Sequence, residues 1–292
     1  MKSKVYFTKD LSGEGLKKVY DALNMQLKGN IAIKVHSGEK GNQNFLRPEF
    51  FKDFLSNFNG TIVECNTAYN GARNETDKHL KLISEHGWNK YFNVDIMDSE
   101  GDTELKIKGG KVITTNYVGK HLLNYDSLLV LSHFKGHPMG GFGGALKQLS
   151  IGCASSAGKC WIHSGGQTKL QSEMWTKKAE QDDFVDAMAE SASTVNDLFK
   201  GKVAYINVMC NMSVDCDCCA VAEDPCIKDI GILASIDPVA IDKACVDLVY
   251  NCDDEHKDHL IERIESRHGT RILKRAEELG VGSQDYELIN LD

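Results

Sequence analysis

The sequence lacks the features of secreted, membrane-spanning and nucleic-acid-binding proteins. Its first residues, MKSKVYFTKDLSGEG, contain no apolar segment of the kind that a signal peptide needs. No stretch of about 18 consecutive apolar residues occurs, so no membrane-spanning helix is predicted. The formal net charge is −8, whereas a general binder of nucleic acid or of anionic membranes needs a basic face. We therefore expect a cytoplasmic protein that binds neither nucleic acid nor membranes.

Proline is scarce, and low-complexity tracts and flexible linkers are absent. The 292 residues include only 4 prolines, and 41% of the residues are hydrophobic. A chain of this length and composition can bury a large core. We expect a single α/β domain over residues 1–292, with two lobes of about 1–118 and 119–292 as the alternative.

Cysteine, in contrast, is abundant. The chain has ten cysteines, and disulfides do not account for them in a reducing compartment. Cys65 and Cys245 lie in strand-like and helix-like segments, where small buried thiols are expected. The cysteines at positions 210, 216, 218, 219 and 226 are too dense and too polar in their surroundings for the same explanation. Clustered thiolates repel one another unless a metal neutralises them, so this cluster indicates a metal site.

The hydrophobic pattern alternates between strand and helix. This rhythm is typical of βαβ units, which predicts a mostly parallel sheet with helices on both faces. Residues 104–118 alternate with period two around Gly109–Gly110 and predict an inserted β-hairpin. We expect residues 155–172 to be irregular. Strands are predicted at 5–7, 30–36, 61–67, 93–98, 127–133, 203–210, 230–236 and 286–291, and helices at 13–28, 47–58, 75–88, 143–152, 180–200, 238–250, 254–267 and 270–279.

Reactive side chains follow several of the predicted strands. His36, His133, Asp237 and the loop that begins at Cys210 lie at or just after strand ends, as does the segment 64–66. Ligands of open α/β sheets bind outside the carboxyl ends of the parallel strands. We therefore expect these residues to meet at one edge of the sheet.

The segment SHFKGHPMGGFGGALK, residues 132–147, offers two kinds of chemistry. His133 and His137 can bind a metal or transfer protons, because imidazole titrates near neutral pH; the alternative is that they only hydrogen-bond the backbone. The glycine run before a short helix can hold an anion on its backbone N–H groups, and Lys147 behind it can contact a phosphate or cofactor. A solvated surface lysine is the alternative. The expected cofactor-binding residues are Gly141, Gly143, Gly144 and Lys147.

The remaining cysteines and His163 match no standard metal motif. Cys153, Cys160 and His163 lack the spacing of a zinc or iron–sulfur site, and DCDCC at 215–219 is not the bacterial ferredoxin run. Two hypotheses remain for these residues. One is a metal held by two loops, and the other is a redox-active thiol pair. The candidate metal ligands are His133, His137, His163, Cys216 and Cys218.

Four segments together resemble a known family. They are KVHSGEKGNQNFLRP (34–48), SHFKGHPMGGFGGALKQLSIGCASSAGK (132–159), DCDC (215–218) and DIGILASIDPVAIDKAC (229–245). They are similar to the prokaryotic family of uncharacterised Fe–S centre proteins, domain of unknown function three-six-two, and the similarity runs from about residue 4 to 291. The resemblance implies an iron–sulfur centre, 4Fe–4S in relatives with an added ferredoxin segment, which this chain lacks.

A shorter stretch is similar to the nickel-pincer lactate racemase family. His137, the Gly143–Gly144 pair, Lys147 and His163 match its His…GGxK…His arrangement. The resemblance implies that Lys147 holds a cofactor, that His137 is catalytic and that His163 ligates metal. The second catalytic histidine of that family has no evident counterpart, although His36 or His133 could serve.

These observations lead to two competing functional expectations. The first is a metal-dependent enzyme, an oxidoreductase or isomerase, that acts on a small molecule with His137, Lys147 and His36 as catalytic residues. The second is a non-catalytic iron–sulfur protein or metal carrier that exchanges electrons with a redox partner protein. A third hypothesis assigns no function to the cysteines: they are unligated and only pack a plain α/β scaffold. The expected cofactor is a transition metal or an iron–sulfur cluster.

Overall fold

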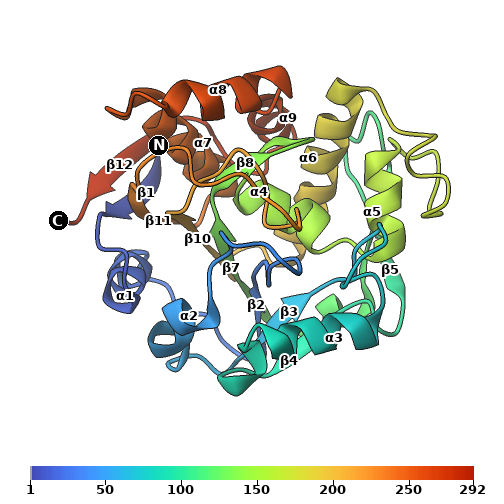
Figure 1. Ribbon diagram of the computed structural model, residues 1–292, viewed down its shortest axis with the longest axis horizontal. Coiled ribbons are helices and arrows are strands. Elements are labelled where there is room, and N and C mark those ends of the chain that lie inside the picture. Colours follow the sequence, from blue (N-terminus) through green and yellow to red (C-terminus); the bar gives the residue numbers. More distant parts are fainter. Residues whose placement is uncertain (1) are drawn as a thin grey trace.

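The computed structural model describes residues 2–292, which fold around one eight-stranded sheet (Figure 1). The strand order is β12-β1-β11-β10-β7-β2-β3-β4. β11 is antiparallel to both of its neighbours, and every other pairing is parallel. The mostly parallel α/β sheet predicted from the sequence is therefore confirmed. The strands are β1 (Ser3–Thr8), β2 (Ile31–Lys34), β3 (Gly60–Glu64), β4 (Val94–Ile96), β7 (Ser127–His133), β10 (Val203–Met209), β11 (Gly231–Ser235) and β12 (Tyr286–Asn290).

Helices cover both faces of the sheet. Alternate residues of β7 enter two separate cores: Leu129 and Leu131 pack with the helices of one face, and Leu128 and Val130 with those of the other. This alternation is the period-two geometry of a strand that is buried on both sides. The first face carries α1 (Gly13–Ala22), α2 (Pro48–Leu55) and α3 (Thr76–Glu85); the second carries α4 (Ala145–Lys147), α5 (Ser156–His163), α6 (Gln181–Leu198), α7 (Pro238–Asn251), α8 (Lys257–Ser266) and α9 (Arg271–Glu278).

Two small antiparallel pairs lie outside the main sheet. β5 (Asp102–Lys106) pairs with β6 (Thr115–Gly119), which confirms the predicted hairpin insertion. β8 (Lys135–His137) pairs with β9 (Gly141–Gly143) in a tight ribbon that the sequence did not predict. The ribbon follows β7 directly, and it fixes the direction of His137. The expectation of one domain, with a division near residue 118 as the alternative, stays a prediction.

Three predicted elements differ from the observed ones. Residues 155–172 are not wholly irregular, because α5 begins after Ser155, whose hydroxyl accepts a hydrogen bond from Gly158 N at 2.9 Å. The predicted helix 13–28 ends at Ala22, close to Asn24 with its positive φ of 49°. The predicted helix 143–152 is divided into α4 and a π-helical turn, η3 (Gln148–Gly152). The short helical turns η1 (Trp88–Lys90) and η2 (Lys120–Asn124) complete the elements.

Asp237 does not lie at the edge of the sheet where the sequence placed it. Because β11 runs antiparallel to β10, its carboxyl end lies at the opposite edge from the carboxyl ends of β7 and β10. Asp237 instead caps α7 and accepts hydrogen bonds from Val239 N at 2.9 Å and Ala240 N at 3.0 Å. The predicted place of Asp237 at the binding edge is therefore wrong. Across residues 2–292, no helix is both long and apolar enough to cross a membrane.

Candidate metal and ligand site

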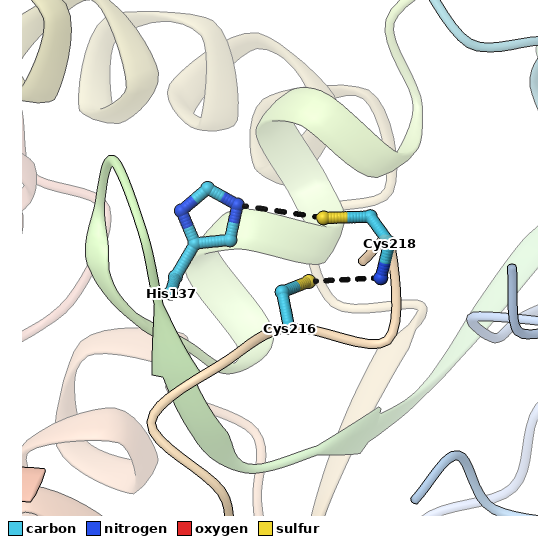
Figure 2. Close-up of side chains that lie close together, drawn as sticks. All are labelled: His137, Cys216 and Cys218. Carbon is cyan, nitrogen blue, oxygen red and sulfur yellow. Dashed lines mark hydrogen bonds between the residues drawn. The ribbon is translucent and has the colours of Figure 1, made fainter. Parts of the chain in front are cut away.

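The cysteine loop, residues 210–226, meets the β8–β9 ribbon at the carboxyl edge of the sheet. Potential ligand atoms of His137, Cys216 and Cys218 all lie within 4.8 Å of one another. Cys218 Sγ is 3.9 Å from His137 Nε2, and the Cys218 N–H points at Cys216 Sγ at 3.5 Å (Figure 2). In a tetrahedral site with metal–sulfur and metal–nitrogen bonds of usual length, sulfur and nitrogen ligands are about 3.6 Å apart. The spacing therefore suits a metal ion.

Side chains from the loop after β2 hold the cysteine loop in place. Asn42 Nδ2 donates to Cys219 O at 2.9 Å, Gln43 Nε2 to Ala222 O at 2.7 Å, and Asn44 Nδ2 to Glu223 O at 2.8 Å. The Glu39 N–H also donates to Asp217 O at 2.8 Å. Residues 34–48, one of the segments that resemble the family, thus hold the cysteine loop in place through hydrogen bonds.

Lys147 lies against Cys216. Its Nζ is 3.2 Å from Cys216 Sγ, and the thiol is buried. Burial alone would raise the pKa of Cys216, but the Cys218 thiol and the Lys147 ammonium hold that pKa well below its usual range. Burial likewise opposes the charge on Lys147, yet Cys216 and Cys218 raise the Lys147 pKa to about 12. The arrangement favours a thiolate–ammonium pair.

His133 lies beside this group but has no free ring nitrogen. Its Nδ1 is 2.9 Å from Asp217 Oδ1, and its Nε2 is 2.6 Å from Cys210 O. Both ring nitrogens are therefore engaged by acceptors of the protein itself. Lys135 Nζ contacts the other oxygen of Asp217 at 2.6 Å. His133 therefore orients the cysteine loop through Asp217 and is not among the converging ligand atoms.

Three other histidines line the cavity, and their hydrogen bonds fix their ring protons. His137 Nδ1 accepts from Gly140 N at 2.8 Å and Met139 N at 3.2 Å, and His36 Nδ1 accepts from Gly38 N at 3.1 Å. The proton of each neutral ring is then on Nε2. His163 is the reverse case, because its Nδ1 donates to Lys159 O at 2.7 Å and leaves a lone pair on Nε2.

Burial keeps these three rings neutral. Burial lowers the pKa of His137 and of His163 to about 4, and it lowers the pKa of His36 well below its usual range. Positive neighbours act in the same direction: Lys147 on His137 and Arg73 on His36. The site therefore combines imidazole N–H donors, at His36 and His137, with one imidazole acceptor at His163.

The glycine run is held by a carboxylate of the protein itself. Asp242 accepts hydrogen bonds from Ala145 N at 2.7 Å and Leu146 N at 2.9 Å, the first amides of α4. A Cβ on Gly144 would lie 2.3 Å from Asp242 Oδ1, so only glycine allows this approach. The expected anion site on the helix amides is thus filled by Asp242. Gly143 and Gly144 still line the cavity, whereas Gly141 takes the positive φ of 79° that the ribbon turn needs.

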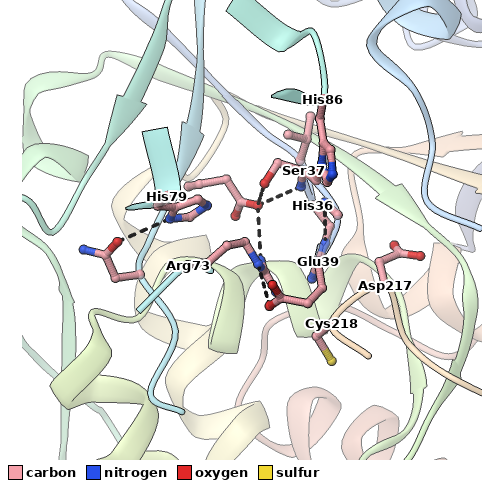
Figure 3. Close-up of polar contacts among 12 residues, drawn as sticks. His36, Ser37, Glu39, Arg73, His79, His86, Asp217 and Cys218 are labelled. Atoms are coloured by element: carbon pink, nitrogen blue, oxygen red, sulfur yellow. Dashed lines mark hydrogen bonds and ion pairs between the residues drawn. The ribbon is translucent and has the colours of Figure 1, made fainter. Parts of the chain in front are cut away.

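The cavity beside the cysteines has a volume of about 180 Å³ and an unusually basic wall. Part of this wall is a buried network at the ends of β2 and β3 (Figure 3). In it, Lys34 Nζ contacts Glu64 at 2.6 Å, and Arg73 Nε contacts Glu39 at 3.1 Å. The cationic residues in the lining are Lys34, Arg73, Lys135, Lys147 and Lys159. Except for Lys147, sequence reasoning missed them, because a single lysine or arginine carries no local signal of burial.

Comparison with known proteins identifies the family of the chain. Residues 31–247 match the model of a family described as Domain of unknown function (DUF362). The chain is similar to the lactate racemase apoprotein from Thermoanaerobacterium thermosaccharolyticum, with 15% identity, a TM-score of 0.39, and coverage of 70% of this chain and 50% of that one. It is also similar to a Thermotoga maritima protein solved by the Northeast Structural Genomics Consortium, with 10% identity, a TM-score of 0.42, and coverage of 91% and 58%.

The chain thus spans about half to three fifths of the length of these two solved proteins. Curated proteins contain no match to it. Similarity at this level assigns no chemistry to the cavity.

Proposed function

The chain belongs to the DUF362 family, and we propose that it is a metal-dependent enzyme, an oxidoreductase or isomerase acting on a small molecule. The metal would be bound by Cys216, Cys218 and His137. One observation carries the proposal: these three donors converge from two loops at the wall of a cavity that is also lined by Lys147, His36 and His163. A transition metal held there would supply Lewis-acid or redox chemistry.

The three donors are not equally prepared for a metal. Cys216 is the best prepared, because the Cys218 thiol and the Lys147 ammonium hold its pKa well below the usual range and so favour the thiolate that a metal binds. Cys218 must lose its thiol proton, because interactions of the thiol with Cys216 and Cys219, together with burial, raise its pKa. His137 must move its ring proton from Nε2 to Nδ1, which breaks the contacts with Gly140 N and Met139 N. Metal binding should therefore release protons and shift the ribbon turn.

Two further histidines can move protons to and from a bound molecule. His163 Nε2 offers a lone pair to the cavity, and His36 Nε2 offers a proton. A neutral acceptor and a neutral donor facing one small cavity can accept a hydrogen bond from a bound molecule and donate one to it. In this proposal Lys147 acts through Cys216, since its ammonium is already paired with the thiolate. A cytoplasmic location, where thiols stay reduced, belongs to the same proposal.

Metal analysis of anaerobically purified protein tests the proposal. Wild-type protein should carry about one transition-metal ion per chain, and Cys216→Ser and Cys218→Ser should each lower that content at least tenfold. Cys252→Ser is the matched control, because the Cys252 thiol donates to Val249 O at the end of α7 and is absent from the converging group. Metal-free wild-type protein with reactive thiols, or equal metal in all four proteins, would refute the proposal.

An iron–sulfur carrier that passes electrons to a partner protein is the second candidate. The density of cysteines in the loop favours it, and Cys218 and Cys219 are partly exposed there. Among residues 2–292, however, only two cysteines enter the converging group, whereas a four-iron cluster needs four thiolates. Visible absorption together with acid-labile sulfide, lost in Cys216→Ser, would establish the carrier and exclude the single-ion site.

A further inference from the structure

One cation in the cavity has no anionic partner. Lys34 contacts Glu64, Arg73 contacts Glu39, Lys135 contacts Asp217 and Lys147 contacts Cys216. The Lys159 ammonium instead donates to a backbone carbonyl, Ala154 O, at 2.6 Å, and within the described part of the chain no carboxylate lies within 4.0 Å of it.

Lys159 is nevertheless buried. Its residue is only 8% exposed, and its side chain lines the cavity. Burial lowers the pKa of Lys159, while Cys65 and Asp98 oppose that shift from beyond ion-pair distance. Both Asp98 oxygens already accept backbone N–H groups, from Asn66 and Ser156. A buried ammonium without a counter-ion is unfavourable because it has lost its hydration, and a bound anion compensates for that loss. An arrangement of this kind is ready for an anionic ligand.

We propose that the cavity binds a small monocarboxylate, with its carboxylate on the Lys159 ammonium and its apolar part among the apolar side chains of the lining. Those side chains are Ala68, Pro138, Met139, Ile151, Met174 and Trp175. One unpaired ammonium matches one negative charge. A doubly charged phosphate would leave its second charge without a partner, since the other four cations are engaged.

The size of the cavity agrees with such a ligand. An engineered apolar cavity of about 150 Å³ holds benzene, so the cavity of about 180 Å³ suits a molecule of similar size. Trp175 is 56% exposed and lines the same cavity, which places an aromatic side chain where the cavity reaches the surface. Cys218 and His137 line it as well, so a molecule held at Lys159 shares the cavity with the proposed metal ligands.

That the bound carboxylate is a substrate rests on the proposed function. The binding itself can be measured without metal. Butyrate and its neutral counterpart butyramide are the probes, and affinities are measured by calorimetry or ligand-observed NMR on chelator-treated and on metal-loaded protein. We expect butyrate to bind chelator-treated wild-type protein at least tenfold more tightly than butyramide. This comparison needs no variant.

Variants then locate the carboxylate. Lys159→Met should weaken butyrate binding at least tenfold and leave butyramide binding unchanged. Lys178→Met removes the same charge from an exposed position and should change neither affinity. Equal affinities for butyrate and butyramide, or unchanged butyrate binding in Lys159→Met, would overturn the inference. Tighter binding of inorganic phosphate than of butyrate would overturn the carboxylate assignment. If the metal analysis refutes the proposed function, these binding results keep their meaning. The two proposals can therefore be refuted separately.

Discussion

Replacing Lys147 by methionine should convert Cys216 from a thiolate to a thiol at neutral pH. The ammonium lies 3.2 Å from Cys216 Sγ. With the effective dielectric constant of about 20 that suits protein sites, two unit charges at that distance attract by about 5 kcal/mol. Water that enters the space left by the ammonium recovers part of this energy, and we expect the Cys216 pKa to rise because the attraction is lost.

The ultraviolet absorbance of thiolates measures this change without requiring access to the buried sulfur. Absorbance is recorded against pH for metal-free wild type, Lys147→Met and Cys216→Ser, and the difference from Cys216→Ser isolates one thiol among ten. Wild type should show one additional thiolate at pH 7, and Lys147→Met should not. Lys178→Met serves as the control for a simple change in net charge, because Lys178 is exposed.

The reasoning fails if Lys147→Met keeps the wild-type titration. In that case Cys218, whose backbone N–H and thiol both approach Cys216 Sγ, would hold the thiolate without Lys147. It also fails if wild type and Cys216→Ser have the same absorbance at pH 7. Cys216 would then be a buried neutral thiol, and the metal site would lose the ligand that needs no deprotonation.

Two further predictions concern stability. Glu190 is fully buried and accepts hydrogen bonds from the amides of residues 111–113 and from Arg275. Glu190→Ala leaves the Arg275 charge buried without this partner, so it should lower the free energy of unfolding, measured by urea titration, by about 3–5 kcal/mol. Glu75→Ala, which removes an exposed partner of a lysine, should cost less than about 1 kcal/mol. For Glu64, burial opposes ionisation but Lys34 and nearby positive groups hold its pKa well below its usual range. That contribution to stability is complete only above about pH 5, beyond the unfolded-state pKa of a glutamate, and is lost as the pH falls toward the folded-state pKa. Glu64→Gln should therefore flatten the acid side of the unfolding free energy against pH.

Periodicity alone was sufficient to predict the sheet. Runs such as 127–133 and 203–210 are apolar on both faces, as in a central strand that helices cover on both sides, and they became the adjacent strands β7 and β10. The direction of β11 could not be read in this way, because an antiparallel strand buried on both faces has the same apolar pattern. The position of Asp237 was wrong for that reason. α5 was missed because its start depends on a serine cap in a sequence otherwise rich in serine and glycine.

The site was predictable in part. The sequence identified the two loops, and the structure brings His137, Cys216 and Cys218 together, while the roles proposed for them stay predictions. The sequence could not identify which candidate metal ligands lie outside this group. His133 is only four residues from His137, yet both of its nitrogens are bound within the protein. Such a difference depends on residues distant in the sequence, here Asp217 and Cys210, which no local spacing reveals.

The charge of the cavity shows why net charge says little about a buried site. The chain carries −8 overall, yet the cavity wall contains five cationic side chains. Four of them are neutralised by Glu64, Glu39, Asp217 and Cys216, which come from separate segments of the chain. Because this compensation is pairwise and local, removing any one acid should leave its partner free to bind an added anion. The acids at this edge therefore set how many anionic groups a ligand can bring, and with one ammonium unpaired that number is one.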